Sequence, residues 1–160
     1  MFPKFQILSS DKISREFQKR EIHDFESAAN YVRHLPYRRN GDKQNIATVF
    51  IDGCGTCSSK HALLKQLAIE NDQHDLKLMI GLFKMNQVNT PEISSTLQQQ
   101  QLEYIPEAHC YLKFKQSILD FTKQNSKPSD FINDIIEEIE ILPDQITDFK
   151  INYHKAYLRS

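Results

Sequence analysis

The segment from residue 76 to residue 85, LKLMIGLFKM, is the feature of the sequence that most constrains the fold. It is almost continuously apolar, and it is too short for a typical buried helix. Uninterrupted apolar runs of this length are typical of strands that are covered on both faces, because neither side of such a strand can face water. The sequence therefore predicts a buried central strand, for which the rest of the chain must supply two covering layers.

A β-hairpin is predicted for residues 104–122, YIPEAHCYLKFKQSILDFT. Side chains alternate between the two faces of a strand, so His109 and Tyr111 are expected on the face that points away from the core. The core-facing side then carries Cys110, Leu112 and Phe114. A tight turn leads into the second strand at 118–121.

The segments before, between and after these strands show the spacing of apolar residues that is typical of helices. This spacing predicts two helices within residues 10–35 and a helix that starts near Cys57, with one buried face and with Lys60 and Lys65 in solvent. Further helices are predicted at 92–104, 129–142 and 146–158. These elements together predict one α+β domain over residues 1–160, in which N-terminal helices and a cysteine-bearing helix pack on a small, mainly antiparallel sheet.

Composition narrows the possible partners. The net charge is −1, from 20 basic and 21 acidic residues, and no basic stripe stands out, so no nucleic-acid partner is expected. No apolar stretch is long enough to span a bilayer, so no membrane partner is expected either. Arg38 and Arg39 lie in the loop 36–45 and are interpreted as an exposed pair, although they could also line a cleft for an acidic substrate. The oligomeric state stays open.

The cysteines are the main candidates for chemistry. Cys54, Cys57 and Cys110 are an odd number, and no secretory signal precedes them, so we expect free thiols and a cytoplasmic protein. One interpretation takes residues 54–57 as a redox motif, because thioredoxin-like folds place C-x-x-C between a strand and a helix. The apolar stretch at 49–53 would be that strand, Cys54 the nucleophile, and Pro106 a cis-proline facing the disulfide.

A second interpretation is a zinc site formed by Cys54, Cys57, His109 and Cys110. Neighbouring residues of a strand point to opposite faces, so His109 and Cys110 cannot easily bind the same ion. We therefore expect no metal and no other cofactor.

The third interpretation is a Cys-His-Asp triad. A thiol in the first turn of a helix lies at the positive end of the helix dipole, which favours the thiolate of Cys57. His109, on a facing strand, would pair with it, and Asp120, a charge within an otherwise apolar strand, would hold the second ring nitrogen. His61 shares a helix face with Cys57 and is interpreted as a solvated or core histidine.

The segments GTCSSKHALLKQL, LKLMIGLF, AHCYLKF and ILDFT resemble, in this order, the transglutaminase-like branch of the papain-type cysteine enzymes. The resemblance covers about residues 47–122. It implies a papain-like fold with Cys57 as nucleophile, His109 as base and Asp120 as the group that orients the base. The chain departs from the family pattern at Tyr111, where members usually carry Trp, and in the short stretch between the histidine and the aspartate.

This resemblance implies thiol-dependent acyl transfer, either hydrolysis of an amide or peptide or transfer to an amine as in transglutaminases. The substrate would be a peptide, a protein or a small amide. Hydrolysis and amine transfer use the same groups, so the sequence does not separate them. The thioredoxin-like redox protein and a non-catalytic binding module on the same fold remain the alternatives.

Overall fold

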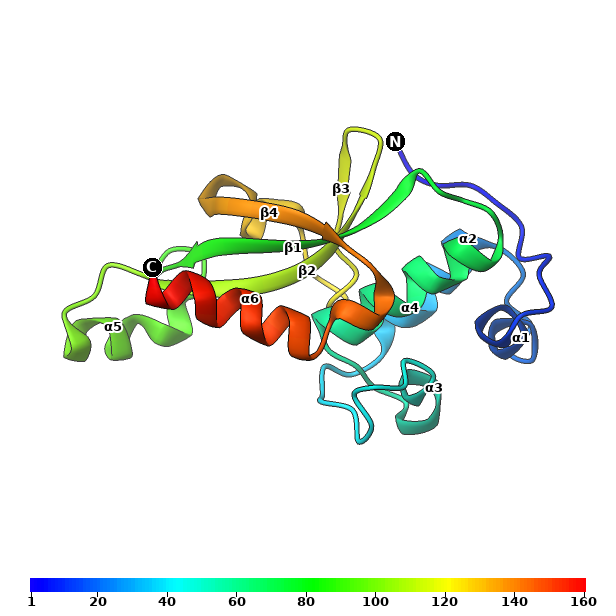
Figure 1. The fold of residues 1–160 in the computed structure, drawn as a ribbon, viewed down its shortest axis with the longest axis horizontal. Helices are drawn as coiled ribbons and strands as arrows, with labels where there is room; N and C mark the ends of the chain where they lie inside the picture. The colour runs from blue at the N-terminus through cyan, green and yellow to red at the C-terminus, as the bar shows by residue number, and fades with distance from the viewer.

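A computed structural model describes residues 1–160 and combines α-helices with one four-stranded sheet (Figure 1). The helices are α1 (Lys12–Gln18), α2 (Phe25–His34), α3 (Thr48–Asp52), α4 (Cys57–Glu70), α5 (Ser94–Gln100) and α6 (Asp148–Arg159). The strands are β1 (Leu76–Met85), β2 (Ile105–Phe114), β3 (Ser117–Leu119) and β4 (Ile135–Ile141). Short 3-10 turns occupy Pro91–Ile93, Pro128–Asp130, Ile132–Asp134 and Pro143–Gln145. The predicted α+β class is confirmed.

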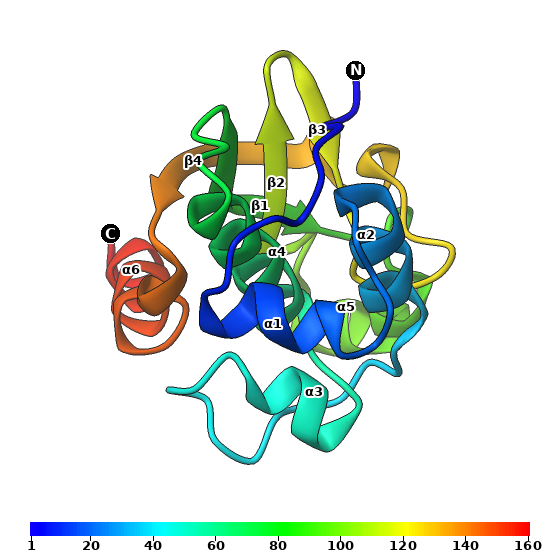
Figure 2. The ribbon, with the colours of Figure 1, turned by 90° about the vertical axis from the view of Figure 1, so that its right-hand side faces the viewer.

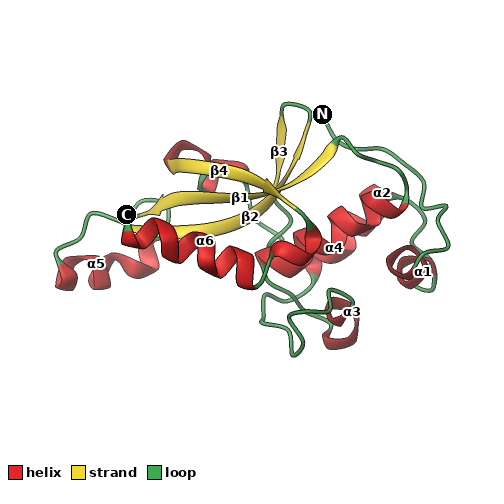
Figure 3. Cartoon of the chain, viewed as in Figure 1, coloured by secondary structure: helices red, strands yellow, loops and turns green.

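The sheet is antiparallel throughout, in the order β3-β2-β1-β4, so β1 is a central strand as predicted. The side chains of Leu78, Ile80 and Leu82 are fully buried in the main core, which α4 shares. A second, smaller cluster covers the opposite face and consists of Met79, Phe83, Tyr111 and Phe131. Figure 3 shows the sheet as one layer, with α4, α5 and α6 on the same side of it.

The alternation predicted for β2 is confirmed. Cys110 and Leu112 are buried in the main core, whereas Tyr111 belongs to the cluster on the other face. His109 pairs with Gly81 of β1, and a Cβ atom at position 81 would lie 2.8 Å from the Tyr111 ring. Glycine is therefore required opposite His109, because only its bare Cα lets the aromatic ring lie so close to β1.

Two predicted elements are wrong. The helix expected at 129–142 is the strand β4, which pairs with β1. Its residues 138–141, EIEI, alternate with period two, as in a strand. The edge of β1 that β2 does not cover forms a ladder of hydrogen bonds with them, which stabilises the strand over the helix. The strand-like stretch 49–53 is mostly the short helix α3, which ends at Gly53 in the left-handed conformation (φ 62°). Glycine adopts this conformation without strain and commonly ends helices.

Helix α4 is buried on nearly all sides rather than on one face. Thr56 begins it with a capping box, in which the Thr56 and Ser59 side chains bond each other's backbone N–H groups. The expectation that Lys60 and Lys65 reach solvent is wrong, since both are buried. Their ammonium groups donate to main-chain carbonyls instead, Lys60 to those of Leu35 and Thr122 at 2.5 and 2.7 Å. Buried charges of this kind are tolerated only when they are hydrogen-bonded.

The remaining helices cover the sides of this core. The two predicted N-terminal helices are present as α1 and α2, and both contact α4. Figure 2 shows the N-terminus beside the β2–β3 turn, where the terminal amino group of Met1 donates to Ser117 Oγ at 2.7 Å. The predicted surface helix near 92–104 is α5, and the last predicted helix is α6. None of the helices combines the length and the apolar character that crossing a membrane requires.

Candidate active site

Cys57 is the first residue of α4, and its side chain is only 7% exposed. The thiol therefore lies beside the unpaired N–H groups and the positive dipole end of a 14-residue helix. Because Thr56 holds the backbone of this first turn, the position of the sulfur is fixed by the cap. The unpaired N–H groups and the positive end of the helix dipole both favour the thiolate of Cys57 over the thiol.

His109 and Asp120 are joined by a hydrogen bond of 3.0 Å between Nε2 and Oδ2. His109 lies in β2. The strand β3 ends at Leu119, two positions before the predicted end, so Asp120 directly follows the strand and does not lie within it. The tight hairpin between them is made by Lys115 in the left-handed conformation (φ 55°). The short stretch between the two residues therefore brings them to the same end of the hairpin.

The Asp120 carboxylate is ionised in this setting. Burial raises its pKa, but the hydrogen bond to His109, together with the donors of Thr122 at 2.9 Å (N) and 2.5 Å (Oγ1), outweighs burial. The net result is a pKa of about 2. A buried charge with this many donors is a stable orienting group for an imidazole.

Cys57 and His109 shift each other's pKa in the directions that favour a thiolate and an imidazolium. The largest influence on the pKa of Cys57 is hydrogen bonding by the Cys110 thiol, which lowers it. Burial raises this pKa, but the charges of Lys150 and His109 lower it further, so that it lies well below its ordinary value. Burial lowers the pKa of His109, but the charge of Cys57 and the bond to Asp120 raise it to about 10. Both shifts favour the form of the pair in which the thiol is deprotonated and the imidazole is protonated.

The orientation of the His109 imidazole leaves one of its two ring nitrogens without a hydrogen-bond partner. Nε2 is engaged by Asp120, so Nδ1 is the atom that remains for Cys57. The thiol and the ring form no hydrogen bond of regular geometry in this conformation, a common situation before substrate binds. Phe131 packs against the ring with centroids 4.7 Å apart and, with Asp120, limits its rotation.

His61 is a core histidine, one of the two roles predicted for it. Its Nδ1 bonds the carbonyl of Cys57 at 2.7 Å, and its Nε2 accepts the backbone N–H of Phe121 at 2.8 Å. A carbonyl only accepts and an N–H only donates, so the ring is the neutral Nδ1–H tautomer. Burial, which lowers its pKa, agrees with this state. His61 thus ties the start of α4 to the residue after Asp120.

The other two thiols have different surroundings. Cys110 is buried beside Cys57, and donation to that sulfur together with burial raises its pKa well above the ordinary value, so it holds its proton. Cys54 is fully buried and precedes the helix cap. Cys110 is buried on the core-facing side of β2, as predicted, and from there it lowers the pKa of Cys57.

The structure removes the support for the redox interpretation. A helix, α3, stands where the strand before Cys54 was expected, and α4 begins at Cys57 rather than at Cys54. The sheet has no parallel pair, and the Ile105–Pro106 bond is trans. The zinc interpretation has no support either, because no group of three or more His, Cys, Asp or Glu side chains is placed to hold a metal ion.

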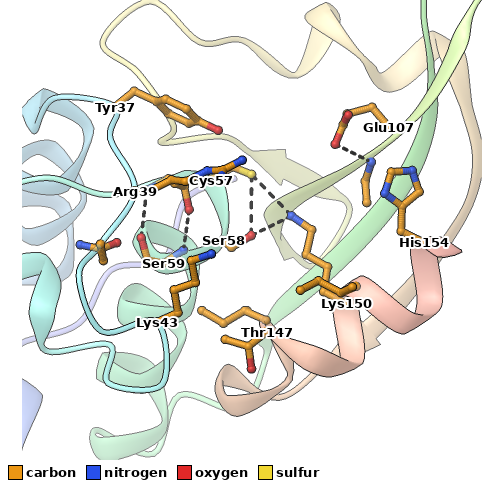
Figure 4. A pocket seen from close by; sticks show the side chains of 15 residues that line it. Tyr37, Arg39, Lys43, Cys57, Ser58, Ser59, Glu107, Thr147, Lys150 and His154 are labelled. Atoms are coloured by element: carbon orange, nitrogen blue, oxygen red, sulfur yellow. Dashed lines mark hydrogen bonds between the residues drawn. The ribbon is translucent and has the colours of Figure 1, made fainter.

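Lys150 is the site residue that sequence reasoning missed. It extends from α6 toward the start of α4, with Nζ 3.9 Å from Cys57 Sγ and 2.7 Å from Ser58 Oγ (Figure 4). Burial lowers its pKa, but the attraction of the Cys57 sulfur outweighs this, and the ammonium stays charged. No motif in residues 146–158 marks this lysine, so only the packing of α6 reveals it.

Cys57 opens into a cavity of about 450 Å³ between the loop after α2, the start of α4, β2 and α6 (Figure 4). Its lining includes Tyr37, Arg39, Lys43, Glu107, Lys150 and His154. Of the arginine pair noted in the sequence, Arg39 lines this cavity and Arg38 does not. A small molecule in this cavity can therefore reach the sulfur of Cys57.

Comparisons of the chain with protein-family models, with curated proteins and with solved structures found no match. The chemistry of the site must therefore be argued from its own geometry.

Proposed function

We propose that this protein is a cysteine-dependent acyl-transfer enzyme of the transglutaminase-like, papain-type kind, with Cys57 as nucleophile, His109 as acid and base, and Asp120 as the positioning residue. The observation that carries the proposal is the 3.0 Å bond from His109 Nε2 to Asp120, which leaves Nδ1 as the ring nitrogen available to the thiol at the start of α4. Neighbouring cations and hydrogen-bond donors that lower the pKa of Cys57 support it further.

The reaction follows from the protonation states. The Cys57 thiolate attacks the carbonyl carbon of an amide or ester, and the electron pair of the C=O bond moves to oxygen. The N–H groups of Cys57 and Ser58, unpaired in the first turn of α4, and the Lys150 ammonium can stabilise this oxyanion. When the tetrahedral intermediate collapses, His109 gives its proton to the leaving amine or alcohol, and a thioester on Cys57 remains.

The second half of the reaction reverses these roles. Neutral His109 takes a proton from water or from an amine, which attacks the thioester and releases an acid or a new amide. The Cys57 thiolate and the His109 imidazolium are restored, so the protons balance. The open side of the cavity admits either acceptor, and the proposal therefore covers both hydrolysis and transfer to an amine.

Alkylation of Cys57 by iodoacetamide across pH tests the proposal without knowledge of the substrate. We expect fast alkylation well below pH 8.5, the region where an ordinary thiol titrates, with peptide-level mass spectrometry assigning the modified cysteine. His109→Ala should shift the profile upward, because the imidazolium that stabilises the thiolate is gone. A Cys57 profile that matches a free thiol, or that is the same in both proteins, would overturn the proposal.

A further inference from the structure

The cavity beside Cys57 concentrates positive charge. The cations Arg39, Lys43 and Lys150 line it, against the Glu107 carboxylate and the thiolate proposed for Cys57. The whole chain carries a net charge of −1, so this excess of cations is a property of the cavity and not of the composition. Fields inside a cleft with low-dielectric walls are focused, which raises the local concentration of anions.

No carboxylate of the protein neutralises these cations. None of Arg39, Lys43 and Lys150 lies within 4.0 Å of a carboxylate, although several other basic side chains of the chain form such ion pairs. Glu107 accepts the backbone N–H of Ala108 at 3.1 Å and pairs with none of them. Lys150 contacts Cys57 and Ser58 and is assigned to the oxyanion in the proposed reaction, so the side chains left for a second anionic group are those of Arg39 and Lys43.

The two available cations come from a single loop with a fixed base. Asn40, between them, donates to the carbonyl of Cys54 at 2.9 Å, and the backbone N–H of Gly41 donates to Asp52 Oδ2 at 3.0 Å. These bonds hold the loop against the segment that leads into α4. The exposed ends of Arg39 and Lys43 therefore stand at the rim of the cavity whose wall holds the nucleophile, as Figure 4 shows.

Building on the proposed function, we infer that the acyl substrate of Cys57 carries a second, negatively charged group, a carboxylate or a phosphate, which Arg39 and Lys43 bind at the rim of this cavity. Guanidinium and ammonium groups are the usual partners of both anions, and arginine can bind either one through two parallel hydrogen bonds. The cavity, at about 450 Å³, has the size of a small-molecule site. The substrate is then a small acyl compound with an anionic group near the bond that is broken.

Two alkylating reagents of different charge test this inference. Iodoacetate and iodoacetamide both form a bond from sulfur to carbon and release iodide, but only iodoacetate is an anion. The ratio of their rates at Cys57, divided by the same ratio for N-acetylcysteine, should exceed one in the wild-type protein. In Arg39→Gln and in Lys43→Gln, the ratio should fall about twofold for each cation at low salt, and about fourfold in the double variant.

A matched control is available in the same loop. Arg38 is exposed and lies outside the cavity, so Arg38→Gln should keep the wild-type ratio. Circular dichroism of each variant verifies that it is folded. An anion preference that is equal in the wild type and in the double variant would overturn the inference, even if iodoacetamide reacts fast. Slow reaction with both reagents would instead refute the proposed function, so the two failures are distinguishable.

Protection experiments identify the anion. Glutarate or inorganic phosphate is added before iodoacetamide, and the rate of Cys57 alkylation is measured. Protection by glutarate supports a carboxylate-bearing substrate, and protection by phosphate supports a phosphate-bearing one. Protection by neither anion would overturn the inference.

Discussion

Replacing Asp120 with asparagine removes one negative charge from the site and nearly preserves the shape of the side chain. Asp120 is 4% exposed, so water screens its interactions little. Its pKa falls from an ordinary value of 3.8 to about 2. Each pH unit by which a pKa moves corresponds to about 1.36 kcal/mol, so we expect the free energy of unfolding at pH 7 to fall by about 2 kcal/mol.

The pH dependence of this loss has a defined sign. The pKa of Asp120 is lower in the folded than in the unfolded protein, so its stabilisation is complete above about pH 4 and disappears as the pH falls through about 2. The difference between the wild type and Asp120→Asn should therefore be constant between pH 7 and pH 5 and shrink toward pH 2. Urea denaturation followed by circular dichroism at several pH values measures it.

A control separates charge from general surface effects. Asp75 is exposed and forms no ion pair, so Asp75→Asn should leave the free energy of unfolding nearly unchanged at every pH. If Asp120→Asn lowered the free energy of unfolding by the same amount at pH 3 as at pH 7, the loss would come from altered hydrogen bonds or packing. The assignment of Asp120 as the charged partner of His109 would then be wrong.

Three further predictions concern the rate at which iodoacetamide alkylates Cys57, measured by peptide mass spectrometry. Cys54→Ala should keep the fast reaction because Cys54 precedes the helix cap, and a large loss would favour the redox interpretation. His109→Ala should slow the reaction at pH 6 at least about tenfold, and an unchanged rate would contradict the triad. Lys150→Ala should slow it about fivefold, as expected for a charge 3.9 Å from the sulfur in water, whereas Lys155→Ala, exposed on the same helix, should not.

The parts of the fold that sequence alone predicts are those in which one periodicity dominates. The run 76–85 has no polar face, and residues 105–114 alternate, so β1 and β2 follow from pattern. Residues 135–141 contain isoleucines that fit a helix and a strand equally well. The open edge of β1 decides between them, and a partner 50 or more residues away is invisible to a local pattern.

The site shows the same limit. Cys57 was predicted from its place at a helix start, His109 from its face on a strand and Asp120 from a charge in an apolar stretch, with their roles implied by the family resemblance. The structure places His109 and Asp120 in direct contact. No such pattern marks Lys150 in its own helix. It reaches Ser58 across 92 positions of sequence, and only the packing of α6 brings it there.

The buried polar side chains of α4 explain how Cys57 and Asp120 are held in fixed relative positions. Lys60 and His61 follow Cys57 closely in α4, and their side chains bond the main chain directly after Asp120, at Thr122 O and Phe121 N. Burying a lysine and a histidine costs free energy of desolvation, and hydrophobic residues could fill the same space without that cost. Their hydrogen bonds connect the helix that carries the proposed nucleophile, Cys57, to the segment that follows the Asp120 carboxylate. Since a catalytic group works only within a fraction of an ångström of its productive position, polar anchors at this point are what a preorganised triad requires.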